Sequence, residues 1–302
     1  VLEEKMVIEL RNNELTVQFK EFGGALSSIK DEDGIEYLWQ GNPQYWSGQA
    51  PVLFPICGSV RDDKVSFDSD NKDILRIIPR HGLVRKENFL FRQIDEQTIA
   101  FTFKSTEVTL KNYPFNFGLK IIYRLHESTI TTQYQVTNTE NNRILPYFIG
   151  GHPGFNCPLI DSDIYEDYYL EFSEEETCSI PKSFPEIGLL DLQNRTPFLM
   201  NERKIDLVHS LFSHDAITFD KLKSRSVSLK SKKSNKGLRV DFKDFSNLII
   251  WSTTNNGPFI ALEPWSGLST SLEESDIFEE KRQVTFVEPG ETSIKSFDIT
   301  IL

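Results

Sequence analysis

The stretch Thr131-Thr132-Gln133-Tyr134-Gln135-Val136 alternates between side chains suited to a buried face and side chains suited to water. This period-two alternation is typical of a β-strand with one face in a core. The 23 phenylalanines of the chain, with many threonines and valines, add to the β preference. Similar short stretches recur at residues 15–19, 89–94, 98–103, 119–123, 227–229, 238–242, 248–251 and 284–287. The sequence therefore predicts an all-β fold, a large antiparallel β-sandwich of roughly twenty short strands.

Helical periodicity is scarce by comparison. We predict only two short helices, at residues 106–112 and 205–212. Turn signals such as Asn255-Asn256-Gly257-Pro258 separate the strands. No linker rich in Pro, Gly or Ser and no repeat of fixed period divides the chain. We therefore expect residues 1–302 to form a single domain.

Composition narrows the classes of function. The formal net charge is −12, with 38% hydrophobic and 26% charged residues, which fits a soluble globular protein. An acidic surface repels nucleic acid and anionic lipid, so we expect neither as a partner. The one dense basic run, residues 221–236, is interpreted as a solvated loop or an exposed strand edge.

Other features favour a cytoplasmic enzyme. No basic-then-apolar leader is recognisable, and no apolar run approaches the roughly 18 residues that span a bilayer. Cys57, Cys157 and Cys178 are odd in number and show no CxxC spacing. We expect reduced, buried thiols in the cytoplasm. The sequence does not set the oligomeric state, and a monomer or a homodimer is expected.

Three distant segments each place one titratable residue among small, proline or aromatic neighbours: Pro79-Arg80-His81-Gly82, Gly150-Gly151-His152-Pro153-Gly154-Phe155 and Leu262-Glu263-Pro264-Trp265. Two imidazoles and one carboxylate suffice to move protons on and off oxygen near neutral pH. The alternatives are a surface-turn histidine for His81, a simple turn at His152 and a carboxylate paired with lysine at Glu263.

The environment of Glu263 is the most suggestive. It follows an apolar strand signature at residues 259–262 and precedes Pro264 and Trp265, so we expect it at a strand terminus beside an indole. Partial desolvation there raises the pKa of a carboxyl group and makes it a better base. The aromatic face of Trp265 would suit the apolar side of a sugar ring. Asp215, at the entrance of another strand, either binds a hydroxyl or caps a turn.

At these residues the chain resembles the aldose 1-epimerase (galactose mutarotase) family, in its LacX-related bacterial branch. The resemblance spans about residues 10 to 300. The matching elements are Phe54-Pro55-Ile56-Cys57-Gly58, Pro79-Arg80-His81-Gly82, Tyr113-Pro114-Phe115, Gly151-His152-Pro153-Gly154-Phe155-Asn156-Cys157-Pro158 and Leu262-Glu263-Pro264-Trp265. The resemblance implies a β-supersandwich fold and an enzyme that interconverts the α and β anomers of an aldose.

The resemblance also implies roles for individual residues. His152 would be the general acid, Glu263 the general base and His81 an orienting or assisting histidine. The family places an arginine after the segment that matches residues 54–58, but Ser59 stands there and the nearest arginine is Arg61. The predicted substrate-binding residues are Arg61, Arg80, Asp215 and Trp265.

These groups suggest a mechanism for opening a hexose hemiacetal. Glu263 takes the O1 proton while His152 protonates the ring oxygen O5, and each positioned transfer is worth roughly 10²- to 10⁴-fold. The C1–O5 bond breaks, rotation about C1–C2 presents the other carbonyl face, and the ring closes. This requires burial to raise the pKa of Glu263 and a negative neighbour to keep His152 protonated.

Competing interpretations stay open. A hexose-phosphate mutarotase is one, because Arg61, Arg80, Arg85 and Lys86 could clasp a phosphate. A carbohydrate-binding or sensing protein without turnover is another, with tryptophans stacked on sugar rings, although we expect most of Trp39, Trp46, Trp251 and Trp265 in the core. The sequence contains no GxGxxG, P-loop, GxSxG or HExxH pattern, so we predict neither a cofactor nor a metal.

Overall fold

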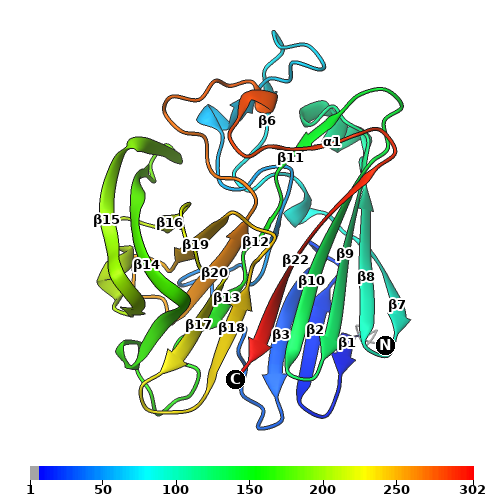
Figure 1. Ribbon diagram of the computed structural model, residues 1–302. Coiled ribbons are helices and arrows are strands. Elements are labelled where there is room, and N and C mark those ends of the chain that lie inside the picture. The colour runs from blue at the N-terminus through cyan, green and yellow to red at the C-terminus, as the bar shows by residue number, and fades with distance from the viewer. Residues whose placement is uncertain (1–6) are drawn as a thin grey trace.

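The computed structural model describes residues 7–302, which form several antiparallel β-sheets with few short helices (Figure 1). The predicted all-β sandwich is confirmed. The largest sheet has nine strands, and every neighbouring pair in it is antiparallel. In spatial order the strands are β15 (Leu189–Asp206), β14 (Tyr168–Phe184), β17 (Ser226–Ser231), β18 (Gly237–Asp241), β22 (Thr292–Ile301), β10 (Thr129–Asn138), β9 (Phe117–His126), β8 (Thr98–Lys104) and β7 (Leu90–Asp95).

The alternating stretch at residues 131–136 lies inside this sheet. It forms most of β10, in which alternate residues are buried. Tyr134 and Val136 point into the core, whereas Gln133 and Gln135 stay partly accessible. Period-two patterning therefore predicted both the element and its buried face.

A second sheet carries the residues of greatest chemical interest. Its six strands are β16 (Ile217–Phe219), β19 (Asn247–Trp251), β20 (Phe259–Trp265), β12 (Gly150–Gly151), β4 (Val52–Leu53) and β13 (Gly154–Asn156), the last of which pairs with β20. The two sheets approach closely at Gly151. A Cβ atom there would lie 2.9 Å from the ring of Phe297, on β22, so glycine allows the contact.

Smaller elements complete the architecture. A three-stranded sheet contains β1 (Ile8–Arg11), β2 (Leu15–Lys20) and β3 (Ala25–Asp31), and two pairs contain β5 (Lys64–Val65) with β6 (Arg76–Ile77) and β11 (Leu145–Tyr147) with β21 (Thr285–Val287). The short 3₁₀ helices are η1 (Arg61–Asp63), η2 (Val84–Lys86), η3 (Tyr165–Asp167), η4 (His209–Phe212) and η5 (Phe278–Glu280). No helix in the described part of the chain is long and apolar enough to cross a membrane. All three cysteines are free and buried.

The two predicted helices had different outcomes. The first is confirmed as α1 (Glu107–Asn112), whose N-cap Thr106 accepts a hydrogen bond from the amide of Thr109. The helix predicted at residues 205–212 is wrong. Ile205 belongs to β15, where it pairs with Leu170 of β14, and only η4 follows. Strand pairing overrides the weak local helical pattern there.

The basic run at residues 221–236 agrees in part with its interpretation as a solvated loop, since Lys232, Lys233 and Lys236 lie in the loop between β17 and β18. The run also contains β17, which lies between β14 and β18 inside the nine-stranded sheet. Its lysines meet acidic partners: Lys230 lies 2.6 Å from Glu171, and Lys233 lies 2.7 Å from Asp167. The positive charges are therefore compensated locally.

Candidate active site

The second sheet and one loop bring the three predicted segments together. His152 follows β12, and Glu263 lies on β20, whose Trp265 pairs with Gly150 of β12. This pairing sets His152 Nε2 3.3 Å from Glu263 Oε2. His81, in the loop between β6 and η2, presents its ring edge-on to His152 with 5.4 Å between centroids. Residues more than 180 positions apart thus share one site (263 − 81 = 182).

Burial of these side chains is deep. His81, His152 and Glu263 are 8%, 7% and 1% exposed. We had expected Glu263 at a strand terminus. It is instead an interior residue of β20, because the strand continues through Trp265. The surrounding sheet therefore fixes its backbone from both sides.

The backbone at His81 adopts a strained conformation. It adopts φ = +67°, which is uncommon for a residue with a Cβ, and Gly82 follows at φ = +80°. A Cβ atom at Gly82 would fall 2.0 Å from the carbonyl oxygen of Phe54, so only glycine fits. The His81 amide donates to Gly58 O at 2.7 Å. Such positions cluster at functional sites, where the surroundings hold the strained backbone.

A cavity of about 350 Å³ opens over the three groups. Arg80, Asp215 and Trp265, which the sequence suggested as substrate-binding residues, lie in its wall. The full set of lining residues is Trp46, Pro51, Arg80, His81, Arg85, His152, Asp215, Ala216, Ile249, Trp251, Glu263 and Trp265. Pro51 and Ile249 were not foreseen, because nothing in their local sequence distinguishes a cavity wall from a core.

Arg61 is not brought to this cavity. Its Nε lies 3.1 Å from Asp276 Oδ1, and its Nη2 donates to the carbonyl oxygens of Ser271, Leu272 and Glu274. These contacts tie the guanidinium to the segment after β20. Arg85, which the sequence suggested only for the phosphate alternative, lines the cavity instead.

Asp215 joins the wall through an aromatic neighbour. Its Oδ1 accepts a hydrogen bond of 2.9 Å from Trp251 Nε1, and its Oδ2 lies 3.9 Å from Arg80. Asp215 also has a positive φ of 74°. Trp46 packs its ring 4.8 Å from that of His152. Trp46 and Trp251 are thus wall residues rather than the core residues we had expected.

The electrostatics of the central pair follow mainly from burial. Burial raises the pKa of Glu263 well above its usual value, as predicted. Burial also lowers the pKa of His152 to about 3, and the positive charges of Arg80 and Arg85 act in the same direction. The expectation that a negative neighbour keeps His152 protonated is wrong, because burial lowers the pKa of His152 despite the carboxyl group beside it. Burial thus disfavours the charged form of both members of the pair.

His81 is held in a neutral form for a related reason. Gly58 N lies 3.3 Å from its Nδ1, and Arg80 Nε lies 3.3 Å from its Nε2. Both neighbours are donors, which disfavours an imidazolium. Burial, then the nearby His152 and the two arginines, lower the pKa of His81 well below its usual value. His81 is therefore suited to accepting or orienting a hydrogen bond.

Several polar atoms in the cavity have no partner. Among the described residues, none hydrogen-bonds His152 Nδ1, Glu263 Oε2 or Trp265 Nε1, although all three atoms are buried. An unsatisfied buried polar atom costs about 1–3 kcal/mol. Within residues 7–302, no group of three or more His, Cys, Asp or Glu side chains is arranged to hold a metal ion. The arrangement can thus bind a polar organic ligand and exchange protons with it.

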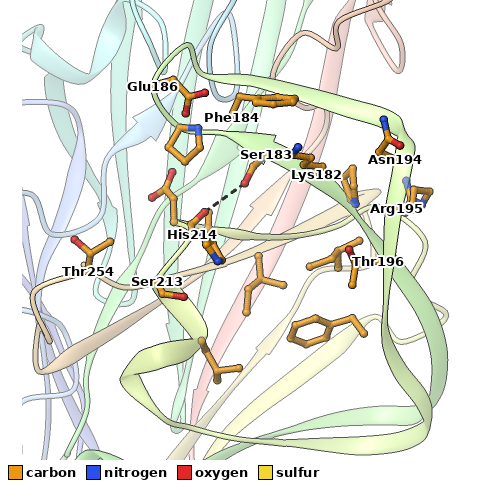
Figure 2. A pocket seen from close by; sticks show the side chains of 18 of the residues that line it. Lys182, Ser183, Phe184, Glu186, Asn194, Arg195, Thr196, Ser213, His214 and Thr254 are labelled. Atoms are coloured by element: carbon orange, nitrogen blue, oxygen red, sulfur yellow. Dashed lines mark hydrogen bonds between the residues drawn. The ribbon is translucent and has the colours of Figure 1, made fainter.

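A larger groove of about 1,410 Å³ adjoins the cavity and shares Asp215 and Ala216 with it. Figure 2 shows its walls, formed by β14 and β15 on one side and by the segment that carries Ser213 and His214 on the other. Ser183 Oγ donates to the carbonyl oxygen of His214 at 3.4 Å. The side chain of His214 is exposed.

Comparison with known proteins places the site in a family context. The family model described as aldose 1-epimerase matches residues 6–281. The plasmid-borne LacX protein of Lactococcus lactis subsp. lactis is 61% identical over 298 residues, which cover 98% of this chain and 100% of that protein. Its chromosomal counterpart is equally similar.

Solved structures agree with this family match. A galactose mutarotase related enzyme from Lactobacillus acidophilus superposes with a TM-score of 0.91 at 27% identity, covering 98% of this chain and 97% of that one. A galactose mutarotase-like protein from Lactobacillus casei superposes with a TM-score of 0.87 at 24% identity, covering 98% of this chain and 100% of that one. This second similarity supports the fold alone.

Proposed function

The chain belongs to the aldose 1-epimerase family, and from that premise we propose that it interconverts the α and β anomers of a hexose by acid/base ring opening. The observation that carries the proposal is the buried pair of His152 and Glu263, 3.3 Å apart in one cavity. Opening a hemiacetal needs one group to accept the O1 proton and another to protonate O5. The pair supplies both groups, so the proposal requires no cofactor.

In the proposed mechanism the pair shares a single proton, which suits a reaction that runs in both directions. In the proposed mechanism a bound sugar displaces water and supplies hydroxyl partners to the unpaired atoms. The proton on Glu263 then passes to His152, which gives a carboxylate and an imidazolium. Glu263 takes the O1 proton as His152 protonates O5, the C1–O5 bond breaks, and ring closure on the other carbonyl face reverses both transfers.

The wall residues have supporting roles in this proposal. His81 orients the substrate as a neutral acceptor or donor, and Asp215 binds a hydroxyl while it holds Trp251 in place. The indole of Trp265 covers an apolar face of the ring and offers its unpaired Nε1. Arg80 stands beside His81 and Asp215, where it can bind a further oxygen. Arg61 is left out because its guanidinium is occupied elsewhere.

We also propose that residues 1–302 act as one unit in the cytoplasm, as a monomer or a homodimer. Support for one unit comes from the spread of the cavity wall from Trp46 to Trp265. Three free, buried thiols are compatible with a reducing compartment.

Exchange NMR between the anomeric proton signals of equilibrated hexoses tests the proposal directly. We expect the protein to accelerate α–β exchange and the Glu263→Gln variant to lose at least about 100-fold. Thermal unfolding of the variant controls for folding. Sugar-dependent stabilisation without accelerated exchange would overturn the proposal and favour a carbohydrate-binding protein.

A further inference from the structure

Two guanidinium groups line the cavity that contains His152 and Glu263, and one of them has no described partner. Arg80 meets Asp215 only at 3.9 Å. Arg85 makes no ion pair and no side-chain hydrogen bond with any residue in 7–302, although it is partly buried. Arg85 therefore faces the cavity without a negative partner, and Arg80 has only the more distant Asp215.

Partly buried arginines elsewhere in the described fold have carboxylate partners. These arginines are Arg61, Arg76, Arg143, Arg195 and Arg282. Arg92 makes no described pair, but it is exposed to solvent on β7. Arg85 is thus a partly buried cation without compensation, at the wall of the proposed active site.

We propose that Arg80 and Arg85 form an anion-binding subsite, and that the natural substrate is a hexose that carries a phosphoryl group. This inference rests on the proposed function and specifies its substrate class. A phosphoryl group carries close to two negative charges and three acceptor oxygens, which matches two guanidinium groups. A neutral hexose would leave Arg85 without a negative partner and Arg80 with Asp215 alone.

The charge balance of the cavity supports the subsite. The lining set contains two carboxyl groups: Asp215, and Glu263, whose charged form burial disfavours. Burial and then the charge of Arg80 lower the pKa of Arg85, as expected for two like charges held close together. This local excess of positive charge contrasts with the net charge of −12 for the whole chain.

The position of the arginines fits a phosphoryl group at C6. Arg80 Nε lies 3.3 Å from His81 Nε2, and His81 is the ring neighbour of His152. In the proposed mechanism His152 protonates O5, and O5 and C6 are both bonded to C5. A substituent on C6 therefore extends on the His152 side of the sugar, toward the two arginines. The cavity of about 350 Å³ lies near the lower end of the roughly 300–1,000 Å³ usual for ligand pockets.

The test compares kcat/KM for α–β exchange of a free hexose and of its 6-phosphate, measured by exchange NMR. We expect the phosphate to be preferred by at least about tenfold. Arg85→Gln should reduce that preference by about tenfold, the lower end of the range expected for a lost charge-assisted contact. Arg85→Lys keeps the positive charge but loses the planar guanidinium that can form two parallel hydrogen bonds, so it should retain part of the preference for the phosphate. The matched control Arg92→Gln should leave the preference unchanged.

Three results would overturn the inference while leaving the proposed function intact: equal use of both sugars, an equal loss on both in Arg85→Gln, or a stronger preference for a uronic acid. Thermal unfolding with inorganic phosphate gives a second readout that needs no turnover. We expect phosphate to raise the melting temperature of the wild type more than that of Arg85→Gln. If no sugar were turned over, the proposed function would fail, and equal phosphate shifts in both proteins would reject the subsite as well.

Discussion

The cavity around His152 and the larger groove beside β14 and β15 share wall residues but differ in whether their polar groups have partners. In the groove, His214 is exposed, and the guanidinium of Arg195 bonds both carboxylate oxygens of Asp220. In the cavity, the side chains of His152 and Glu263 are buried, and each leaves a polar atom without a partner.

Size and chemistry are therefore uncoupled in this molecule. The groove has about four times the volume of the cavity (1,410 against 350 Å³), yet its charged groups are already satisfied or solvated. Desolvation without compensation shifts pKa values and leaves hydrogen-bonding capacity for a ligand. The smaller cavity is for this reason the better candidate for catalysis.

The largest expected effect separates the histidines of the two regions. His152→Ala should lower the rate of anomer exchange by roughly 10²- to 10⁴-fold, because it removes one of the two proton-transfer groups. His214→Ala, in the groove, should change the rate by less than about twofold, because an exposed side chain takes no part in either transfer. Polarimetry on a freshly dissolved pure anomer measures both. A loss in His214→Ala as large as that in His152→Ala would contradict the assignment of chemistry to the smaller cavity.

A pair of aspartates gives the next largest contrast. Asp215→Asn should lower kcat/KM by about tenfold, because a neutral amide binds a hydroxyl and the Trp251 indole less strongly than a carboxylate does. Asp220→Asn should leave kcat/KM nearly unchanged. It should instead reduce the free energy of unfolding by about 3 kcal/mol, since Arg195 then stays buried without its charge partner. Steady-state kinetics and urea unfolding of both variants give the comparison. The opposite pattern would mean that the groove is the reactive site.

The sequence predicted much of this arrangement. The period-two stretch in β10 and the apolar run before Glu263 specified strands whose pairing depends on the same alternation. The glycine and proline neighbours of His81 and His152 pointed to special backbone positions, and His81 does have a positive φ.

Long-range placement was beyond the sequence. Arg61 and Arg85 lie in similarly polar segments, and only the fold shows that Asp276 and three carbonyls occupy Arg61 whereas Arg85 faces the cavity. The protonation of His152 was also unpredictable, because it depends on whether burial or the neighbouring carboxylate dominates. Burial dominates, and it acts on both members of the pair.

The smallest expected effect concerns the pH dependence of stability, where the two members of the pair act in opposite directions. The pKa of His152 is about 3 in the fold and near 6.5 in an unfolded chain. Between these values the unfolded chain binds the extra proton, so His152 contributes a loss of stability as the pH falls below about 6.5. Burial lowers the pKa of His81 as well, which adds to the loss of stability at acidic pH.

Glu263 produces the opposite limb of the stability profile, a fall in folding stability as the pH rises. Its pKa is raised in the fold, so above about 4.5 the unfolded chain releases a proton that the folded protein retains, and stability falls as the pH rises. Glu263→Gln removes this limb. We expect its stability relative to wild type to increase by at least about 1 kcal/mol from pH 5 to pH 8, since one pKa unit corresponds to about 1.4 kcal/mol. Glu186→Gln, at an exposed glutamate in the groove, is the matched control for the loss of a carboxyl group. Urea unfolding at four pH values measures both differences. A constant difference for Glu263→Gln would show that Glu263 is ionised in the folded protein, and would remove the proton that the proposed transfer to His152 needs.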